Sequence, residues 1–203
     1  RVAAVLVGEG LQPGNRVLLR GANSPMFAAC WLAVVKAGGI VVATMPLLRA
    51  RELRYIIDKA KIAFALCDAT LRGELDAVGA PLTALYYNDS RADGLAARMA
   101  RQSGAFAPVI ASADDVALIA FTSGTTGNAK GTMHFHRDLL AICDMWQPLL
   151  QTTPDDVFAG SAPFAFTFGL GAMLLFPLRH GASSVLLEQA TPLALMEAIA
   201  RRK

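Results

Sequence analysis

The chain has 203 residues, of which 54% are hydrophobic and 17% charged, and its formal net charge is +3. This length and apolar content can bury a substantial core in one large domain or two small ones. The charge is small and no Lys/Arg cluster alternates with aromatic residues, so a nucleic-acid partner is disfavoured. The 3 cysteines are widely spaced. They match neither a disulfide framework nor a metal site, and they indicate a reducing, cytoplasmic setting.

The first half alternates apolar strand patterns with helix patterns. Strands are expected at residues 15–20, 40–43, 63–67 and 82–87, and helices at residues 24–36 and 51–59. Ser24 and Pro25 have the N-cap and first-position chemistry of a helix start, and Gly38-Gly39 follows its end. Continuous apolar strands separated by helices predict an α/β fold with mostly parallel sheets sandwiched by helices.

The second half continues the alternation. A polar connection, residues 88–112, carries a surface helix at 94–101 and joins two α/β halves, about 1–87 and 113–203. Strands are expected at residues 116–121, 157–159 and 183–187, and helices at 136–150, 169–178 and from 192 onward.

Residues 26–48 are apolar enough to span a bilayer on length alone. Lys36 stands in their middle and Pro46 near their end, so a helix, a glycine turn and a buried strand are expected in place of a transmembrane segment. The chain starts without Met or a signal peptide and ends within a helical pattern, as expected for an internal piece of a longer protein.

Residues 121–131 read F-T-S-G-T-T-G-N-A-K-G and follow an apolar strand pattern directly. The glycines let backbone N–H groups converge on a ligand, the hydroxyls donate hydrogen bonds, and Lys130 adds a mobile cation. No acidic residue occurs from Val116 to Arg137. The pattern predicts a polyphosphate-binding loop, although the spacing of its glycines and lysine differs from the common nucleotide P-loop.

The motif T-S-G-T-T-G-x-x-K-G at residues 122–131, followed by H-R-D-L at 136–139, resembles the phosphate-binding motif of the adenylate-forming enzymes. These are acyl-CoA synthetases, adenylation domains of peptide synthetases, and luciferases. Residues 36–46 and 162–171 resemble two further motifs of that superfamily in the same order, over nearly the whole chain. The stretches H-F-H-R-D-L and P-F-A-F-T-F-G-L-G look most like ligases for benzoate-type acids, above all the 2-aminobenzoate–CoA ligases.

The resemblance assigns roles position by position. The ATP phosphate-binding positions are Thr122, Ser123, Gly124, Thr125, Thr126, Gly127 and Lys130. The positions for the carboxylic acid are Phe166, next to the carboxylate, and Thr167, Phe168 and Gly169, which line the aromatic pocket. This chain departs from the family at Ala129, where the family usually has Pro. The loss of Pro frees φ and makes the loop less rigid.

The resemblance implies that ATP activates a small-molecule carboxylic acid to an acyl-adenylate, which CoA then converts to a thioester, with Mg²⁺ bridging phosphate oxygens. The family's later acidic and lysine motifs and its C-terminal domain are not in this chain, so no catalytic residue is assigned and the chain alone is expected to be inactive. Two alternatives stay open, an adenylation domain that loads a carrier protein and a non-catalytic nucleotide-binding module. The sequence is compatible with a homodimer.

Two patterns have a second interpretation. The period-two spacing of Phe164, Phe166 and Phe168 is also typical of plain strand packing. His134 and His136 would lie on one face of a strand, within reach of a metal, but two histidines without matching ligands are a weak signal. No metal site is therefore predicted, and His136 is expected to be a structural histidine at a helix start.

Overall fold

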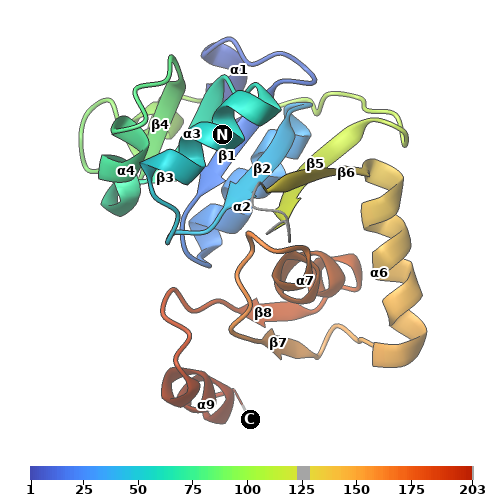
Figure 1. Cartoon of the computed structure of the whole chain (residues 1–203). Helices are drawn as coiled ribbons and strands as arrows, with labels where there is room; N and C mark the ends of the chain where they lie inside the picture. The colour runs from blue at the N-terminus through green and yellow to red at the C-terminus, as the bar shows by residue number, and fades with distance from the viewer. Residues whose placement is uncertain (123–128, 203) are drawn as a thin grey trace.

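The computed structural model describes residues 1–122 and 129–202, and a six-stranded sheet lies at its centre (Figure 1). The strand order is β4-β3-β1-β2-β5-β6. The strands of this sheet are β1 (Arg16–Arg20), β2 (Ile40–Thr44), β3 (Phe64–Asp68), β4 (Thr83–Tyr87), β5 (Val116–Thr122) and β6 (Lys130–Phe135). The strands β1 to β5 run parallel to one another, and β6 runs antiparallel to β5. The expected mostly parallel α/β sheet is confirmed.

Helices cover both faces of this sheet. They are α1 (Val2–Gly8), α2 (Pro25–Lys36), α3 (Ala50–Ala60), α4 (Arg72–Asp76) after the short turn η1 (Ala69–Leu71), and α5 (Leu95–Ala100). The predicted start of α2 is confirmed, since the Ser24 hydroxyl accepts a hydrogen bond from the Phe27 N–H at 3.1 Å. Gly38, just past the end of α2, has a φ of +76° that favours glycine.

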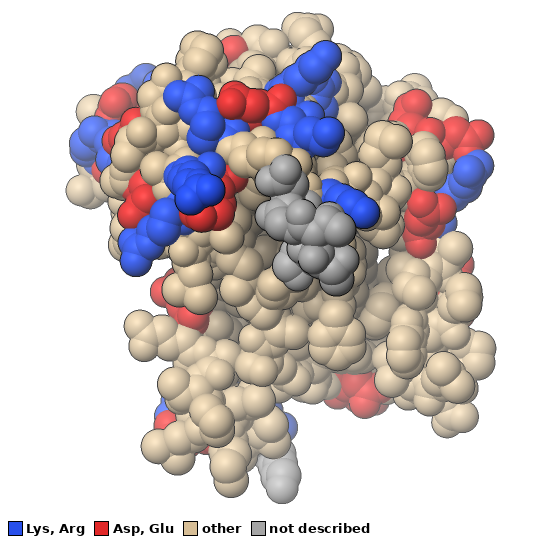
Figure 2. Space-filling view, in the orientation of Figure 1, with Lys and Arg blue, Asp and Glu red and all other residues tan. Residues whose placement is uncertain are grey.

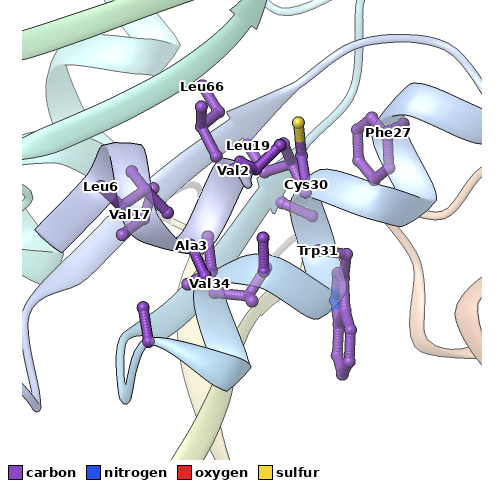
Figure 3. Packing of buried hydrophobic residues seen from close by; sticks show 14 of the residues in the cluster. Val2, Ala3, Leu6, Val17, Leu19, Phe27, Cys30, Trp31, Val34 and Leu66 are labelled. Atoms are coloured by element: carbon purple, nitrogen blue, oxygen red, sulfur yellow. The ribbon is translucent and has the colours of Figure 1, made fainter. Parts of the chain in front are cut away.

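Alternating side chains along the strands build two cores. Val17 and Leu19 of β1 point to one face, where they pack with α1 and α2 in the cluster that Figure 3 shows. Leu18 points to the other face and packs with Leu53 and other apolar residues of α3. The strands β1, β2 and β3 are thus buried on both sides, which is why the sequence shows continuous apolar runs there instead of alternation.

The remaining elements form a second layer beside the end of the sheet where β5 and β6 pair (Figure 1). They are α6 (His136–Leu150), α7 (Thr167–Leu170), the π turn η2 (Gly171–Leu175), α8 (Phe176–Arg179), α9 (Pro192–Ala200), and a small parallel sheet of β7 (Val157–Ala159) and β8 (Ser183–Val185). The two segments on either side of residues 88–112 meet in the large sheet, because β5 pairs with β2. The division of the chain into two halves stays a prediction.

Several elements differ from the sequence prediction. The short helices α1 and α4 were not expected. The apolar helix expected at residues 169–178 begins at Thr167 and widens into the π turn η2. Pro177 has no N–H to donate four residues back, so an α-helical hydrogen bond to Met173 cannot form. The strand β6 was not expected either, because most of its side chains are exposed and show no apolar alternation.

None of the helices in residues 1–122 and 129–202 is long and apolar enough to cross a membrane. The stretch at residues 26–48 is α2, a turn and β2, as the sequence predicts. Cys30, Cys67 and Cys143 are free and buried. Burial raises the pKa of both the Cys30 and the Cys67 thiol to about 12, so both are protonated at neutral pH.

Candidate functional site

The predicted phosphate-binding loop connects β5 to β6. Thr122 and Lys130, the last residue of β5 and the first of β6, are paired in the antiparallel register. Ser123, Gly124, Thr125, Thr126 and Gly127 lie outside the described residues, so their positions stay predictions. The two strands therefore fix both ends of the motif at the edge of the sheet, and Lys130 is exposed there.

A tyrosine of the first half contacts the returning end of the loop. The Tyr55 hydroxyl of α3 donates a hydrogen bond to the Ala129 carbonyl at 3.0 Å. This bond constrains the position where the family usually has Pro. Sequence reasoning missed Tyr55, because its partner lies 74 residues away and no local pattern marks a tyrosine on an amphipathic helix as a loop contact.

Two cavities open beside the ends of the loop. The larger, about 640 Å³, extends toward α3 and is lined by Ala43, Thr44, Met45, Leu48, Arg51, Glu52, Tyr55, Ile56, Phe121, Thr122, Ala129, Ala165 and Phe166. The smaller, about 390 Å³, lies against β6 and is lined by Ala120, Phe121, Thr122, Thr132, His134, Ala165, Phe166 and Thr167. The structure thus brings Thr122 of the phosphate motif together with Phe166 of the acid motif.

A third cavity of about 620 Å³ lies between α6 and the α7–η2 helix and is almost wholly apolar. Its lining includes two predicted acid-pocket residues, Thr167 and Phe168, with Leu118, Leu139, Ile142, Trp146 and Phe176 among the apolar side chains. It shares His134 and Thr167 with the smaller cavity beside the loop. Figure 2 shows the charged side chains mostly on the half of this face that carries the large sheet, and few on the half with α7 and β7.

The acid motif is a turn followed by a helix, so the interpretation of its three phenylalanines as a strand is wrong. Phe164 is 2% exposed and packs on Phe27 with ring centroids 5.6 Å apart. The Phe166 N–H donates to the Pro163 carbonyl at 3.0 Å, and Phe166 is the N-cap residue of α7. Phe166 and Phe168 are 48% and 73% exposed, so only Phe164 belongs to the core.

Gly169 is buried against backbone and does not line the cavities described above. A Cβ on Gly169 would lie 2.2 Å from the Pro163 carbonyl oxygen and 2.6 Å from the Ala162 oxygen. Only a glycine lets the first turn of α7 pack this closely on residues 162–163. Gly169 therefore fixes where α7 packs, next to Thr167 and Phe168.

Two sets of polar contacts hold the start of α3 beside the larger cavity. The Glu74 carboxylate accepts the Ala50 N–H at 2.8 Å and the Arg49 guanidinium at 2.9 Å, and these bonds lower the pKa of Glu74. Arg20 is fully buried and donates to the carbonyls of Met45, Pro46 and Leu48 at 2.8 to 2.9 Å. The turn that lines this cavity is thereby fixed to β1.

The sequence placed His134 and His136 on one face of a strand, and the structure shows that this prediction is wrong. His134 belongs to β6, whereas His136 is the first residue of α6 and its N–H donates to the Asp115 carbonyl at 3.1 Å. Within the described ranges no three His, Cys, Asp or Glu side chains come together as metal ligands. Sequence reasoning considered His134 only as a metal ligand and missed that it lies where two cavities meet.

Comparison with known proteins identifies the class of this fold and site. The sequence matches the AMP-binding enzyme family over residues 1–203, and the chain belongs to this family. It is 30% identical to a benzoate–CoA ligase of Thauera aromatica, in an alignment that covers 96% of this chain and 38% of that protein. The resemblance read from the sequence motifs is confirmed at the level of the family.

Solved structures agree with this assignment. ATP-bound MatB from Rhodopseudomonas palustris matches with a TM-score of 0.89 at 33% identity, covering 98% of this chain and 40% of that one. The anthranilate CoA ligase AuaEII in complex with anthranoyl-AMP matches with a TM-score of 0.87 at 25% identity, covering 93% and 37%. The chain therefore spans 37–40% of the length of these relatives.

Proposed function

We propose that the protein containing this chain activates a carboxylic acid with ATP and transfers the acyl group to CoA. The acid carboxylate attacks the α-phosphorus of ATP, and the bond to the leaving pyrophosphate breaks, which gives an acyl-adenylate. The CoA sulfur then attacks the acyl carbon, loses its proton, and AMP leaves. The observation that carries this proposal is a set of three neighbouring cavities with shared lining residues. Thr122 and Phe166 line both cavities beside the loop, and Thr167 lines the smaller of these and the apolar cavity.

The chain's own residues have distinct roles in this proposal. The hydroxyls and N–H groups of residues 122–127 and the Lys130 ammonium would hold the β- and γ-phosphates and stabilise the leaving pyrophosphate. Phe166, which lines both cavities beside the loop, would lie against the carboxylate and the new adenylate. Thr167 and Phe168 would contact the acid's apolar part in the cavity along α6.

Mg²⁺ prefers oxygen ligands and commonly binds through substrate phosphates and a few protein groups. The Thr122 hydroxyl beside the cavity fits that donor set, and the phosphates of ATP would supply further oxygens. Mg²⁺ would neutralise charge on the phosphates when bound. We therefore propose that it enters with ATP.

The apolar lining favours an aromatic acid of the benzoate type. Its described lining contains no Lys or Arg and few polar side chains, so a second carboxylate on the acid would have no Lys or Arg partner there. The similarity to the benzoate and anthranilate ligases supports this acid class. We place the enzyme in the cytoplasm, in accord with its buried, unpaired cysteines.

ATP–pyrophosphate exchange by the complete protein tests the proposal, with benzoate, 2-aminobenzoate and medium-chain fatty acids as substrates. Exchange with the aromatic acids, and an acyl-CoA product after CoA is added, is the expected result. No exchange with any acid would refute the ligase assignment, and exchange with fatty acids alone would refute the aromatic one. Acyl transfer to a carrier protein without transfer to CoA would favour the adenylation-domain alternative.

A further inference from the structure

Asn23 lies in the loop between β1 and α2 and is buried. Its side-chain amide binds a segment 139 to 141 residues away, with both of its polar groups in use. The Nδ2–H donates to the Ala162 carbonyl at 2.8 Å, and the Phe164 N–H donates to Oδ1 at 2.8 Å. Asn23 therefore satisfies a backbone donor and a backbone acceptor of the acid motif at once.

These two bonds matter because residues 160–166, between β7 and α7, belong to no strand or helix. Regular secondary structure therefore does not supply hydrogen bonds for their backbone groups. A buried backbone group without a partner is destabilising, so an irregular segment needs such side-chain partners. The Phe164 ring rests on Phe27 at 5.6 Å, which holds the same segment against α2. Gly169 packs on the backbone of residues 162–163 from the side of α7.

Asn23 thus links the loop that follows β1 to the segment that precedes Phe166 and Thr167, the residues that would contact the acid. Phe166 follows Phe164 by two residues, and its N–H donates to the Pro163 carbonyl within the same turn. Phe166 lines both cavities beside the phosphate loop. A shift of residues 162–164 would therefore displace Phe166 and the start of α7 relative to Thr122, which β5 holds in place.

We propose that Asn23 is a positioning residue for acid activation, which sets Phe166 and Thr167 at the correct distance from the phosphate loop. This inference rests on the proposed function. Asn23 is far from the acid motif in the sequence. It would act on the reacting groups only indirectly, through residues 162–166. A residue needed for stability alone would change folding without changing the acid's KM selectively.

The test compares Asn23→Ala and Asn23→Asp with Ser24→Ala in the complete protein. Ser24→Ala is the matched control, because Ser24 lies in the same loop and is buried. Among the described residues, its side chain bonds only within its own segment, to the Phe27 N–H. Asn23→Asp keeps an acceptor for the Phe164 N–H and loses the donor to Ala162. It has the shape of Asn and leaves no cavity, so it separates loss of the donor from loss of packing and decides the question if Asn23→Ala does not fold.

We expect kcat/KM for the acid in pyrophosphate exchange to fall by about 10- to 100-fold in the Asn23 variants, as misplacement of reacting groups by about 1 Å can cause. The KM for ATP should change less than threefold, and Ser24→Ala should keep the wild-type acid KM. Values for the Asn23 variants within twofold of Ser24→Ala, or equal losses for acid and ATP, would overturn the proposal.

Amide hydrogen exchange of residues 160–170 gives a readout independent of catalysis. Exchange there should accelerate at least tenfold in both Asn23 variants and remain at the wild-type rate in Ser24→Ala. If the wild-type enzyme activates none of the acids, the proposed function fails, whereas the exchange data still decide whether Asn23 fixes this segment. Unchanged protection in the Asn23 variants would contradict the positioning role.

Discussion

Replacing Gly169 by Ala should destabilise the protein, although Ala is the better helix former. The new Cβ would lie 2.2 Å from the Pro163 carbonyl oxygen, and real Cβ contacts essentially never fall below 3.0 Å, so α7 or its neighbour must move by about 0.8 Å. The obstructing atoms are backbone, which cannot rotate away. Overpacking of this kind costs about 1–3 kcal/mol, against a gain of up to about 1 kcal/mol in helix propensity.

Gly73→Ala is the matched control for this prediction. Gly73 lies in α4, is exposed, and has nothing within 4 Å of the position of a Cβ, so only the helix-propensity gain applies there. The difference between the two variants isolates the overpacking cost of about 1–3 kcal/mol. At about 2–4 °C per kcal/mol, Gly169→Ala should melt roughly 2–12 °C below Gly73→Ala. Equal melting temperatures in thermal unfolding of the complete protein would refute the packing argument.

Three further changes have defined outcomes. Tyr55→Phe removes the hydrogen bond to Ala129, which is worth about 1 kcal/mol. The KM for ATP should therefore rise about fivefold while the KM for the acid stays the same. An unchanged KM for ATP would contradict a role of this bond in ATP binding. Phe164→Ala should lower the free energy of unfolding by about 3–5 kcal/mol in denaturant titrations, because it leaves a cavity against Phe27; a loss below about 1 kcal/mol would contradict its core position. Glu74 has a folded-state pKa below its ordinary 4.5, so its stabilisation is present above pH 4.5 and is lost as pH falls through the lower value. Thermal unfolding of Glu74→Gln should therefore depend less on pH below 4.5 than wild type, and identical slopes would contradict the assignment.

Much of the sheet could be predicted from the sequence, because its signals are local. The apolar runs of β1, β2 and β3, the Ser24 cap and the glycines after α2 each act within a few residues. The strand β6 could not be predicted in this way. In the part of the chain that the structure describes, it pairs with β5 alone and exposes most of its side chains, so it carries no burial pattern.

The candidate site was predictable only where a motif lies in one stretch of sequence. Thr122, Lys130, Phe166 and Thr167 are candidates predicted in this way, and the structure brings Thr122 and Phe166 to the same two cavities. The groups that hold those stretches in place were missed. Asn23 and Tyr55 act on partners 139 and 74 residues away, and such contacts exist only after the chain has folded.

The most direct test of the account is the KM for ATP of Lys130→Ala in pyrophosphate exchange, beside Lys59→Ala. Lys59 lies in the last turn of α3, next to Ala60, whose carbonyl accepts a hydrogen bond from Arg16. Arg16 begins β1 whereas Thr122 ends the parallel strand β5, so Lys59 lies at the opposite end of the strands from the loop and its loss should have no effect. If residues 122–131 bind the phosphates, Lys130→Ala should raise the KM for ATP at least tenfold with an unchanged melting temperature. An ATP KM equal to that of Lys59→Ala would contradict the central claim that this loop binds ATP.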